Sequence, residues 1–294
     1  MDLDLAARRQ FFAEDIQATC NLQTPALVEA LACVPREAFL KPGPWLVVGE
    51  GMVMTGPRQT PDADPRHLYH NLSVGIDPAR QLFNGAPGVV SVMIDALRLK
   101  PGARVLHVGA GWGYYSAVIA HCLGPAGRVV ALEVDEALAT QARANLAPWP
   151  TVEVRHDNGA GRLDGTFDAM LFSAGATHPR DAWLDALAPG GRMVLPLTVA
   201  FEKVPSPMSA GPAIGKGVVV CIGRGDDGQT WDARVTTMIA IYSAIGVRDE
   251  TMNARLGEAL KRNPFPRLTR LRRDAHEPDA SCWLHGETAC LATA

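Results

Sequence analysis

The sequence predicts an α/β fold in which a mostly parallel, doubly wound sheet carries helices on both faces and continues into a C-terminal antiparallel hairpin. Strand-like and helical segments alternate between residues 104 and 197, and such alternation is typical of a parallel sheet covered by helices. Two β-rich segments, 217–224 and 231–242, then flank a turn that contains Asp227 and Gly228. This spacing predicts the hairpin.

The N-terminal hundred residues predict helices and loops. Residues 1–40 are expected to be helical, and Pro35 ends or bends the helix over 27–34. Residues 41–67 are rich in proline and glycine and lack periodicity, so we expect a long irregular insert there, with further loop over 68–87. The other expected elements are helix 88–97, strand 104–108, helix 114–123, strand 128–133, helix 136–146, strands 152–155 and 167–172, helix 180–187, strand 191–197, the hairpin, helix 250–262 and an irregular tail.

The composition is that of a globular chain without a large charged surface. The 294 residues include 47% hydrophobic and 20% charged side chains, and the formal net charge is -3. This balance gives no basic surface for nucleic acid. No apolar run approaches the length of a membrane span, and the N-terminus lacks the apolar core of a signal peptide. We therefore expect a cytoplasmic protein with no nucleic-acid or membrane partner, and its oligomeric state is left unknown.

A glycine turn between strand 104–108 and helix 114–123 is the strongest functional signal. Gly109, Gly111 and Gly113 let the backbone turn sharply and come close to a ligand. Glu133 ends the next strand, where a carboxylate can accept hydrogen bonds from both hydroxyls of a ribose. The pattern therefore predicts a site for a cofactor that contains adenosine.

Three details favour S-adenosylmethionine over NAD at this site. The spacing is Gly-x-Gly-x-Gly rather than the Gly-x-Gly-x-x-Gly expected under a pyrophosphate. The turn lies in mid-chain, and Asp157 and Asn158 follow a third strand, where an adenine amino group needs an acceptor. The alternative is an α/β domain whose glycines serve only tight turns. The predicted cofactor-binding residues are Gly109, Ala110, Gly111, Trp112, Gly113, Tyr114, Glu133, Asp157, Asn158 and Ser173.

Several further segments occur in the order and spacing of one enzyme family, over about residues 25 to 245. The matching pieces are residues 34–40, 81–87, 99–102, 107–114, Glu133, 157–159 and 190–196. The chain resembles the protein-L-isoaspartate O-methyltransferase family. The resemblance implies a Rossmann-like class I methyltransferase fold that binds S-adenosylmethionine. It also implies three segments: an N-terminal helical and substrate-loop region (1–100), the cofactor-binding domain (101–245), and a C-terminal helix and tail packed on the core (246–294).

The resemblance implies a methyl acceptor that carries a carboxylate, on a protein or peptide. The chain departs from the family at the substrate loop, where Asn84 stands in place of the usual hydroxyl residue, and at Asn71, where the family has an acid. These changes leave open a methyltransferase redirected to a small-molecule or peptide natural-product substrate. A homologue that binds the cofactor or a partner without turnover is the third reading.

Four residues are candidates for the transfer step itself. Arg80, Gln81 and Asn84 lie close together in the sequence and could orient the oxygens of a carboxylate. His178 follows the fourth strand and could act as a general base or donate a hydrogen bond. The plain alternatives are a surface charge for Arg80, a turn residue for Asn84 and a helix cap for His178.

The tail carries histidine, cysteine and acidic residues but no familiar metal motif. They are His276, Glu277, Asp279, Cys282, His285 and Cys290. Their spacing fits no familiar zinc finger, so we predict no metal site. We expect the tail to pack over the substrate side, where Arg272 or Arg273 could help to bind an acidic substrate.

Overall fold

The computed structural model describes residues 3–49, 52, 55–200 and 213–293. Its helices are α1 (Leu3–Cys20), α2 (Pro25–Cys33), α3 (Pro87–Ala96), α4 (Tyr114–Leu123), α5 (Glu136–Asn145), α6 (Asp181–Asp185) and α7 (Glu250–Arg262), with 3-10 turns η1 (Arg36–Phe39), η3 (Pro65–Leu68) and η4 (Pro78–Arg80). Within these described ranges, no helix has the length and apolar character needed to cross a bilayer.

The strands form two sheets. They are β1 (Leu46–Val48), β2 (Arg58–Gln59), β3 (Ser73–Asp77), β4 (Leu82–Phe83), β5 (Arg104–Val108), β6 (Arg128–Glu133), β7 (Val152–His156), β8 (Phe167–Phe172), β9 (Leu187–Ala200), β10 (Ile214–Arg224), β11 (Trp231–Tyr242), β12 (Arg270–Arg272), β13 (Cys282–His285) and β14 (Cys290–Ala292).

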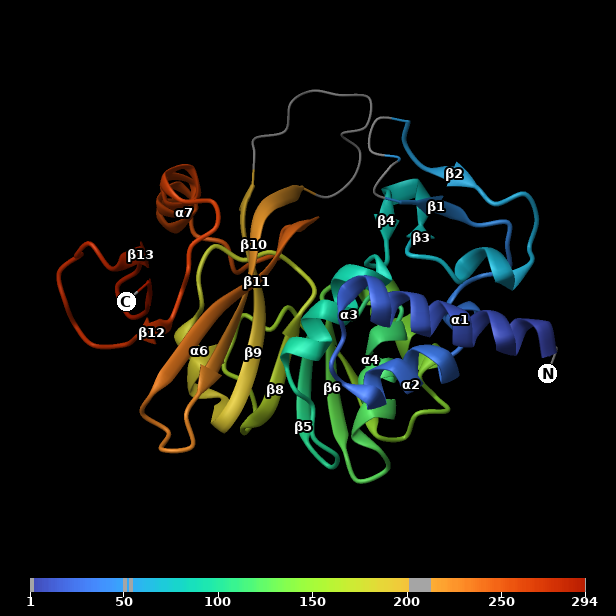
Figure 1. The fold of residues 1–294 in the computed structure, drawn as a ribbon, viewed down its shortest axis with the longest axis horizontal. Helices are drawn as coiled ribbons and strands as arrows, with labels where there is room; N and C mark the ends of the chain where they lie inside the picture. The colour runs from blue at the N-terminus through green and yellow to red at the C-terminus, as the bar shows by residue number, and fades with distance from the viewer. Residues whose placement is uncertain (1–2, 50–51, 53–54, 201–212, 294) are drawn as a thin grey trace.

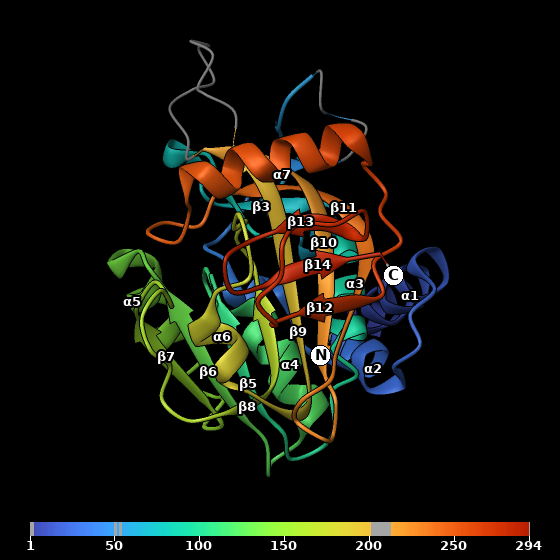
Figure 2. The same ribbon diagram turned by 90° about the vertical axis from the view of Figure 1, so that its left-hand side faces the viewer.

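The large sheet has ten strands in the order β13-β14-β12-β11-β10-β9-β8-β5-β6-β7 (Figures 1 and 2). The strands from β7 to β9 pair in parallel, and all pairs from β9 to β13 are antiparallel. The predicted α/β fold is confirmed. Its antiparallel part is larger than the expected hairpin, because three tail strands extend it.

Alternating side chains bury both faces of this sheet. Val105, Leu171 and Val194 point to the face that packs against α1–α4, whereas Leu106 and Met170 point to the face that packs against α6 and α7. Figure 1 shows the N-terminal helices on one side of the molecule, and Figure 2 shows α7 crossing above β12–β14. Helices therefore cover both faces, as a doubly wound sheet requires.

The order of the parallel strands reverses beside β5. The chain goes from β5 to β6 and β7 on one side, and then returns to β8 and β9 on the other. The carboxyl ends of β5, β6 and β8 therefore meet at one edge of the sheet. Such a switch point is where open α/β sheets bind ligands.

The expectation of an irregular insert is wrong for part of residues 41–87. β1–β4 form a small antiparallel sheet in the order β2-β1-β3-β4. Val74 and Ile76 alternate with more exposed neighbours in β3 and are buried. Strands of two to five residues are too short to give a clear period in sequence, so their residues resemble loop in the sequence alone.

The tail also forms strands where irregular chain was expected. β12, β14 and β13 continue the large sheet from the edge of β11. The strand expected over 191–197 is longer than predicted. β9 begins at Leu187, and Gly190, with φ 73°, lies at an irregularity in its pairing with β8.

Candidate functional site

The glycine turn between β5 and α4 has the backbone shape that the sequence predicts. Gly109, Gly111 and Gly113 have positive φ angles of 82°, 58° and 93°, which glycine adopts without steric cost. The N–H groups of Gly109 and Ala110 donate to the carbonyl of Leu132 at 2.8 and 3.0 Å. These bonds tie the turn to the end of β6, so that bare backbone faces the switch point.

Glu133, the last residue of β6, places a buried carboxylate beside this turn. Its Oε2 accepts a hydrogen bond from the Gly111 N–H at 2.8 Å, and its Oε1 accepts one from the Asp135 N–H at 3.0 Å. Burial raises the pKa of the Glu133 carboxyl, and the backbone donors oppose that shift. Each carboxylate oxygen has a further lone pair, so Glu133 can also accept from a ligand hydroxyl.

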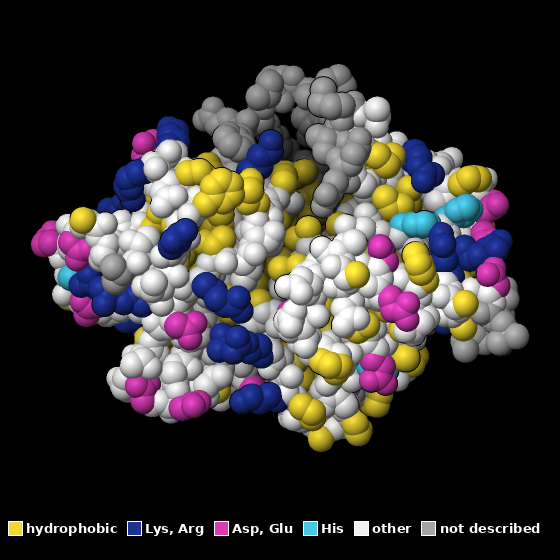
Figure 3. Space-filling model, in the orientation of Figure 1, with side chains coloured by type: hydrophobic (Ala, Val, Ile, Leu, Met, Phe, Trp, Pro, Cys, Tyr) yellow, Lys and Arg dark blue, Asp and Glu magenta, His cyan; other side chains and the backbone are white. Residues whose placement is uncertain are grey.

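A cavity of about 1700 Å³ joins the glycine turn to the loop over residues 80–86. Its other walls come from β1, β3, α3, β10, β11 and α7, and Figure 3 shows hydrophobic side chains in a hollow at the upper centre of the molecule. The predicted site residues among its lining are Arg80, Gln81, Asn84, Gly109, Ala110, Gly111, Trp112, Tyr114, Glu133 and Ser173. The fold thus brings most predicted cofactor residues and the predicted substrate loop to one space.

Internal contacts already hold the polar groups of the substrate loop. The Arg80 guanidinium donates to Asp77 at 2.6 Å and also to Asp135, so two carboxylates balance its charge. The Asn84 Oδ1 accepts from the Val74 N–H at 2.7 Å. This bond leaves the Asn84 amide N–H₂ group as the side-chain donor available to a ligand.

Two tyrosines fix this loop against the core. The Tyr242 hydroxyl donates to the Gln81 carbonyl at 2.8 Å and accepts from the Phe83 N–H at 3.0 Å. The Tyr115 hydroxyl donates to the Gly85 carbonyl at 2.6 Å. Both tyrosines line the cavity, so the loop is set by the end of β11 and the start of α4.

A buried histidine orients Ser173. His107 lies in β5, and its two ring nitrogens are 2.8 Å from the Ser116 Oγ and 3.0 Å from the Ser173 Oγ. Burial lowers the pKa of His107 to about 4, so the ring is neutral at pH 7 and one nitrogen donates while the other accepts. His107 thereby links α4 to the end of β8 at the floor of the cavity.

Two lysines place positive charge at the cavity. Lys216 extends from β10 and Lys261 from α7, and both line the cavity with exposed side chains. Lys261 is paired with Glu258 at 2.8 Å. Lys216 has no ion-pair partner among the described residues, so its charge is available to an anionic ligand.

Trp112 and Tyr114 both contribute aromatic wall. Trp112 is buried against Ile76 and Leu138. Tyr114 packs edge-on against Phe39, and burial raises the pKa of its phenol to about 12. The Tyr114 hydroxyl is buried and has no hydrogen-bond partner within the described part of the chain.

Four predicted site residues do not line the cavity: Gly113, Asp157, Asn158 and His178. The side chains of Asp157 and Asn158 cap a local turn. The Asp157 carboxylate accepts from the Gly159 N–H at 2.7 Å, and the Asn158 amide oxygen accepts from the Ala160 N–H at 2.9 Å. The Nδ1 of His178 is 3.0 Å from the Thr177 Oγ1, and burial lowers the pKa of the ring.

The expectation that the tail covers the substrate side is wrong. Arg272 and Arg273 do not line the cavity. Arg272 pairs with Asp274 and Asp279, both at 2.8 Å, and Arg273 pairs with Asp185 at 2.8 Å. The tail pairs with the edge of β11 instead, so these arginines form ion pairs at the far edge of the sheet.

Sequence reasoning missed His107, Lys216, Tyr242 and Lys261. A histidine within an apolar strand, just before the glycine turn, is a signal that could have been used. The two lysines and Tyr242 lie on β10, β11 and α7. The local sequence of those segments does not indicate that they fold close to the glycine turn.

Comparisons with known proteins agree with this geometry. The family model described as Protein-L-isoaspartate(D-aspartate) O-methyltransferase (PCMT) matches residues 61–206. A protein-L-isoaspartate O-methyltransferase of Methylorubrum extorquens is 34% identical over 197 residues, which cover 66% of this chain and 75% of the relative.

Two solved structures share the fold. A protein-L-isoaspartate O-methyltransferase has a TM-score of 0.61 at 17% identity, over 97% of this chain and 88% of that chain. A Plasmodium falciparum structure, described as a beta-aspartate methyltransferase (PCMT) in complex with S-adenosyl-L-homocysteine, has a TM-score of 0.55 at 16% identity, over 80% of this chain and 97% of that one.

Proposed function

The chain belongs to the protein-L-isoaspartate(D-aspartate) O-methyltransferase family, and from this premise we propose that it transfers a methyl group from S-adenosylmethionine to a carboxylate of a protein or peptide. One observation carries the proposal. The buried Glu133 carboxylate, the glycine turn and the loop over residues 80–86 border a single cavity, so a cofactor and an acceptor can meet there.

The residues present fit the cofactor. Gly111 borders the cavity at φ 58°, where a side chain would fill ligand space. Glu133 would accept from the ribose hydroxyls while it keeps its bonds to the backbone. Trp112 adds apolar wall beside the turn, and the Ser173 hydroxyl, held by His107, would contact the cofactor from β8.

The acceptor half of the cavity suits a group that is already ionised. Bound S-adenosylmethionine supplies an electrophilic methyl group, and a carboxylate attacks such a carbon without a strong general base. The protein then has to align the two and exclude water. Val90, Met93 and Ile239 give apolar walls, the Asn84 amide can donate to a carboxylate oxygen, and Lys216 can attract its charge.

A second candidate keeps the chemistry and changes the acceptor. The loop presents the Asn84 amide where the family resemblance implies a hydroxyl, and β10, β11 and α7 add walls to a wide cavity. These observations favour a small-molecule or peptide natural-product carboxylate as the alternative substrate.

The test is methyl transfer from labelled S-adenosylmethionine to an isoaspartyl peptide and to the matching aspartyl peptide. Selective labelling of the isoaspartyl peptide supports the first proposal. Tight binding of S-adenosylhomocysteine without labelling of either peptide favours the redirected acceptor. Absence of both binding and labelling would overturn the methyltransferase assignment, and binding without transfer to any carboxylate in a substrate panel would indicate a non-catalytic homologue.

Several assignments stay predictions. His178 and Asp157 remain candidates for catalysis and adenine binding, although neither lines the cavity. The cytoplasmic location and the division into three segments also stay predictions.

A further inference from the structure

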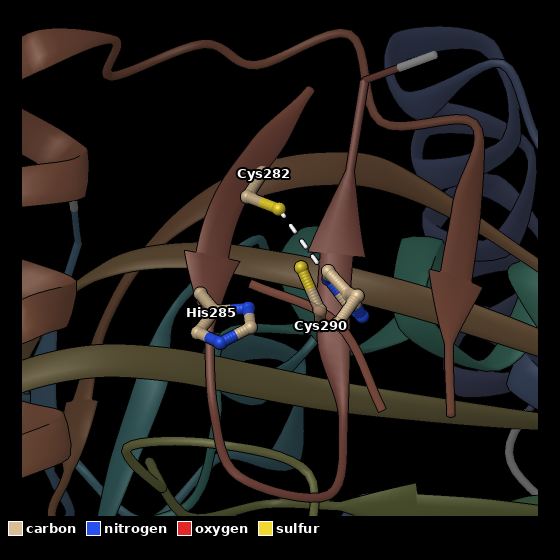
Figure 4. Close-up of side chains that lie close together, drawn as sticks. Cys282, His285 and Cys290 are labelled. Carbon is tan, nitrogen blue, oxygen red and sulfur yellow. Dashed lines mark hydrogen bonds between the residues drawn. The ribbon is translucent and has the colours of Figure 1, made fainter. Parts of the chain in front are cut away.

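Four metal-binding side chains come together in the C-terminal tail, outside the cavity. They are His276, Cys282, His285 and Cys290, and one ligand atom from each lies within 4.8 Å of all the others. His276 precedes β13, Cys282 and His285 begin and end β13, and Cys290 begins β14. Figure 4 shows the Cys282, His285 and Cys290 side chains converging between these two strands.

The hairpin explains why the sequence spacing concealed this cluster. His285 and Cys290 are direct partners across the β13–β14 pair, so their side chains leave the same face of the hairpin. Cys282 lies at the other end of β13, and its Sγ is 3.5 Å from the His276 Nε2. The fold thus gathers residues whose spacing fits no familiar finger.

The distances and ligand types suit one tetrahedral zinc ion. Zinc bonds of about 2.0 to 2.3 Å place tetrahedral ligand atoms roughly 3.3 to 3.8 Å apart, which a small closure of this cluster would reach. Two cysteines and two histidines form a common structural zinc set. Two thiolates also balance the charge of Zn²⁺.

Hydrogen bonds around the cluster are compatible with a metal. The Cys282 and Cys290 thiols donate to the Asp279 Oδ1 at 3.6 Å and to the Leu291 carbonyl at 3.9 Å, and these thiol protons are lost when zinc binds. The His276 Nδ1 lies 2.8 Å from the Asp274 carbonyl, so that nitrogen can donate while Nε2 faces Cys282, as in zinc sites whose histidines are held by a second partner. The Asp279 N–H donates to the Cys282 Sγ at 3.4 Å. The His285 Nδ1 is buried and has no hydrogen-bond partner within the described residues, a state that costs free energy unless something binds it.

We propose that His276, Cys282, His285 and Cys290 bind one structural Zn²⁺ ion. This proposal departs from the prediction of no metal site, which depended on the spacing of these residues in the sequence alone. Both cysteines are free thiols in the structure, as zinc binding requires.

The metal would brace the wall of the cavity. Arg255 of α7 donates to the His285 carbonyl at 3.2 Å, and Arg262 of α7 donates to the Trp283 carbonyl at 2.9 Å. α7 in turn lines the cavity through Gly257, Leu260 and Lys261. The hairpin of β13 and β14 thus contacts α7 directly, and α7 forms part of the cavity wall on the acceptor side.

The first test is metal content of the full chain, purified without chelators and measured by inductively coupled plasma mass spectrometry. We expect about one zinc per chain, and at least about a tenfold loss in Cys290→Ser and in His285→Ala. Cys20→Ser, outside the cluster, is the matched control and should keep its zinc. Loss of zinc in Cys33→Ser instead would move the metal to a weaker cluster of Glu29, Cys33 and His121 and overturn the proposal.

A second test uses the unmodified chain, so it does not depend on the folding of variants. Reduced, metal-free protein is titrated with Co²⁺, and we expect one equivalent to give the visible absorption of tetrahedral cobalt with a thiolate charge-transfer band. Absence of zinc together with absence of this spectrum would overturn the site. A disulfide between Cys282 and Cys290, found by mass spectrometry of the freshly purified protein, would also overturn it.

Discussion

Replacing Gly111 with alanine should weaken cofactor binding at a small cost in stability. Gly111 has φ 58°, where a Cβ atom costs roughly 1 to 2 kcal/mol. A Cβ built there meets only Ile76 Cδ1, at 3.5 Å, which is an ordinary contact. We therefore expect the free energy of unfolding to fall by roughly 1 to 2 kcal/mol and no more.

The loss of cofactor affinity has a different cause. Gly111 lines the cavity and donates its N–H to Glu133, so the added methyl group would stand beside the carboxylate that binds the ribose. Inserting a methyl group into a filled site costs roughly 1 to 3 kcal/mol. This corresponds to a rise in Kd for S-adenosylhomocysteine of roughly 5- to 150-fold.

Gly124→Ala is the matched control. Gly124 lies at the other end of α4 with φ 67°, and a Cβ there has no neighbour within 4 Å. Gly124 also has ψ -174°, in a region essentially confined to glycine, so Gly124→Ala should lose at least as much stability in urea denaturation as Gly111→Ala. Only Gly111→Ala should lose affinity in calorimetry. Unchanged affinity in Gly111→Ala, or an equal loss in Gly124→Ala, would refute the assignment of the glycine turn.

Three further substitutions test other parts of the site. Tyr242→Phe removes the two hydrogen bonds that the Tyr242 hydroxyl makes to the substrate loop, so it should lower the free energy of unfolding by roughly 1 to 3 kcal/mol and raise KM for the acceptor while Kd for S-adenosylhomocysteine is kept. Lys216→Ala should raise KM for an acidic acceptor roughly two- to fivefold at low salt, whereas Lys100→Ala should not; equal KM values in both would exclude the role of Lys216. His107 stays neutral in the folded chain until about pH 4, but the unfolded chain binds that proton below about pH 6.5, so stability should fall by about 3 kcal/mol as pH drops through this range. His107→Asn should flatten that part of the pH profile in urea titrations.

The parallel half of the sheet could be predicted because its signals are local and strong. Residues 104–108, 114–123, 128–133 and 167–172 form β5, α4, β6 and β8 with the predicted bounds. Each strand is a short apolar run that ends at glycine or at polar residues. The small sheet and the tail strands could not be predicted, because strands of two to five residues gain their stability from pairing with distant chain rather than from local pattern.

The same difference between local and distant signals decides which site residues could be predicted. Gly111, Glu133 and Ser173 could be placed together because parallel strands bring their carboxyl ends to one edge. His178 also follows such a strand, but the chain turns away after β8 and the ring lies beside Thr177. Lys216 and Tyr242 lie on antiparallel strands that bring them to the cavity. The residues of these strands do not reveal how the strands align with the rest of the sheet, so the two positions could not be predicted.

Two parts of the chain therefore form different walls of the cavity. Residues 61–206, which the family model matches, contain the glycine turn, Glu133 and the substrate loop. The opposite wall comes from β10, β11 and α7, which follow that segment, and the proposed zinc hairpin holds α7 through Arg255 and Arg262.

Removal of zinc should therefore affect the acceptor before the cofactor. In protein treated with a chelator, we expect KM for the acceptor to rise while Kd for S-adenosylhomocysteine stays close to that of the zinc-bound chain, because backbone hydrogen bonds at the end of β6 hold the glycine turn and Glu133. Restoring Zn²⁺ should reverse the change. If both constants worsened equally, the hairpin would support the whole sheet rather than the acceptor wall, and acceptor choice would have to be sought in the loop around Asn84.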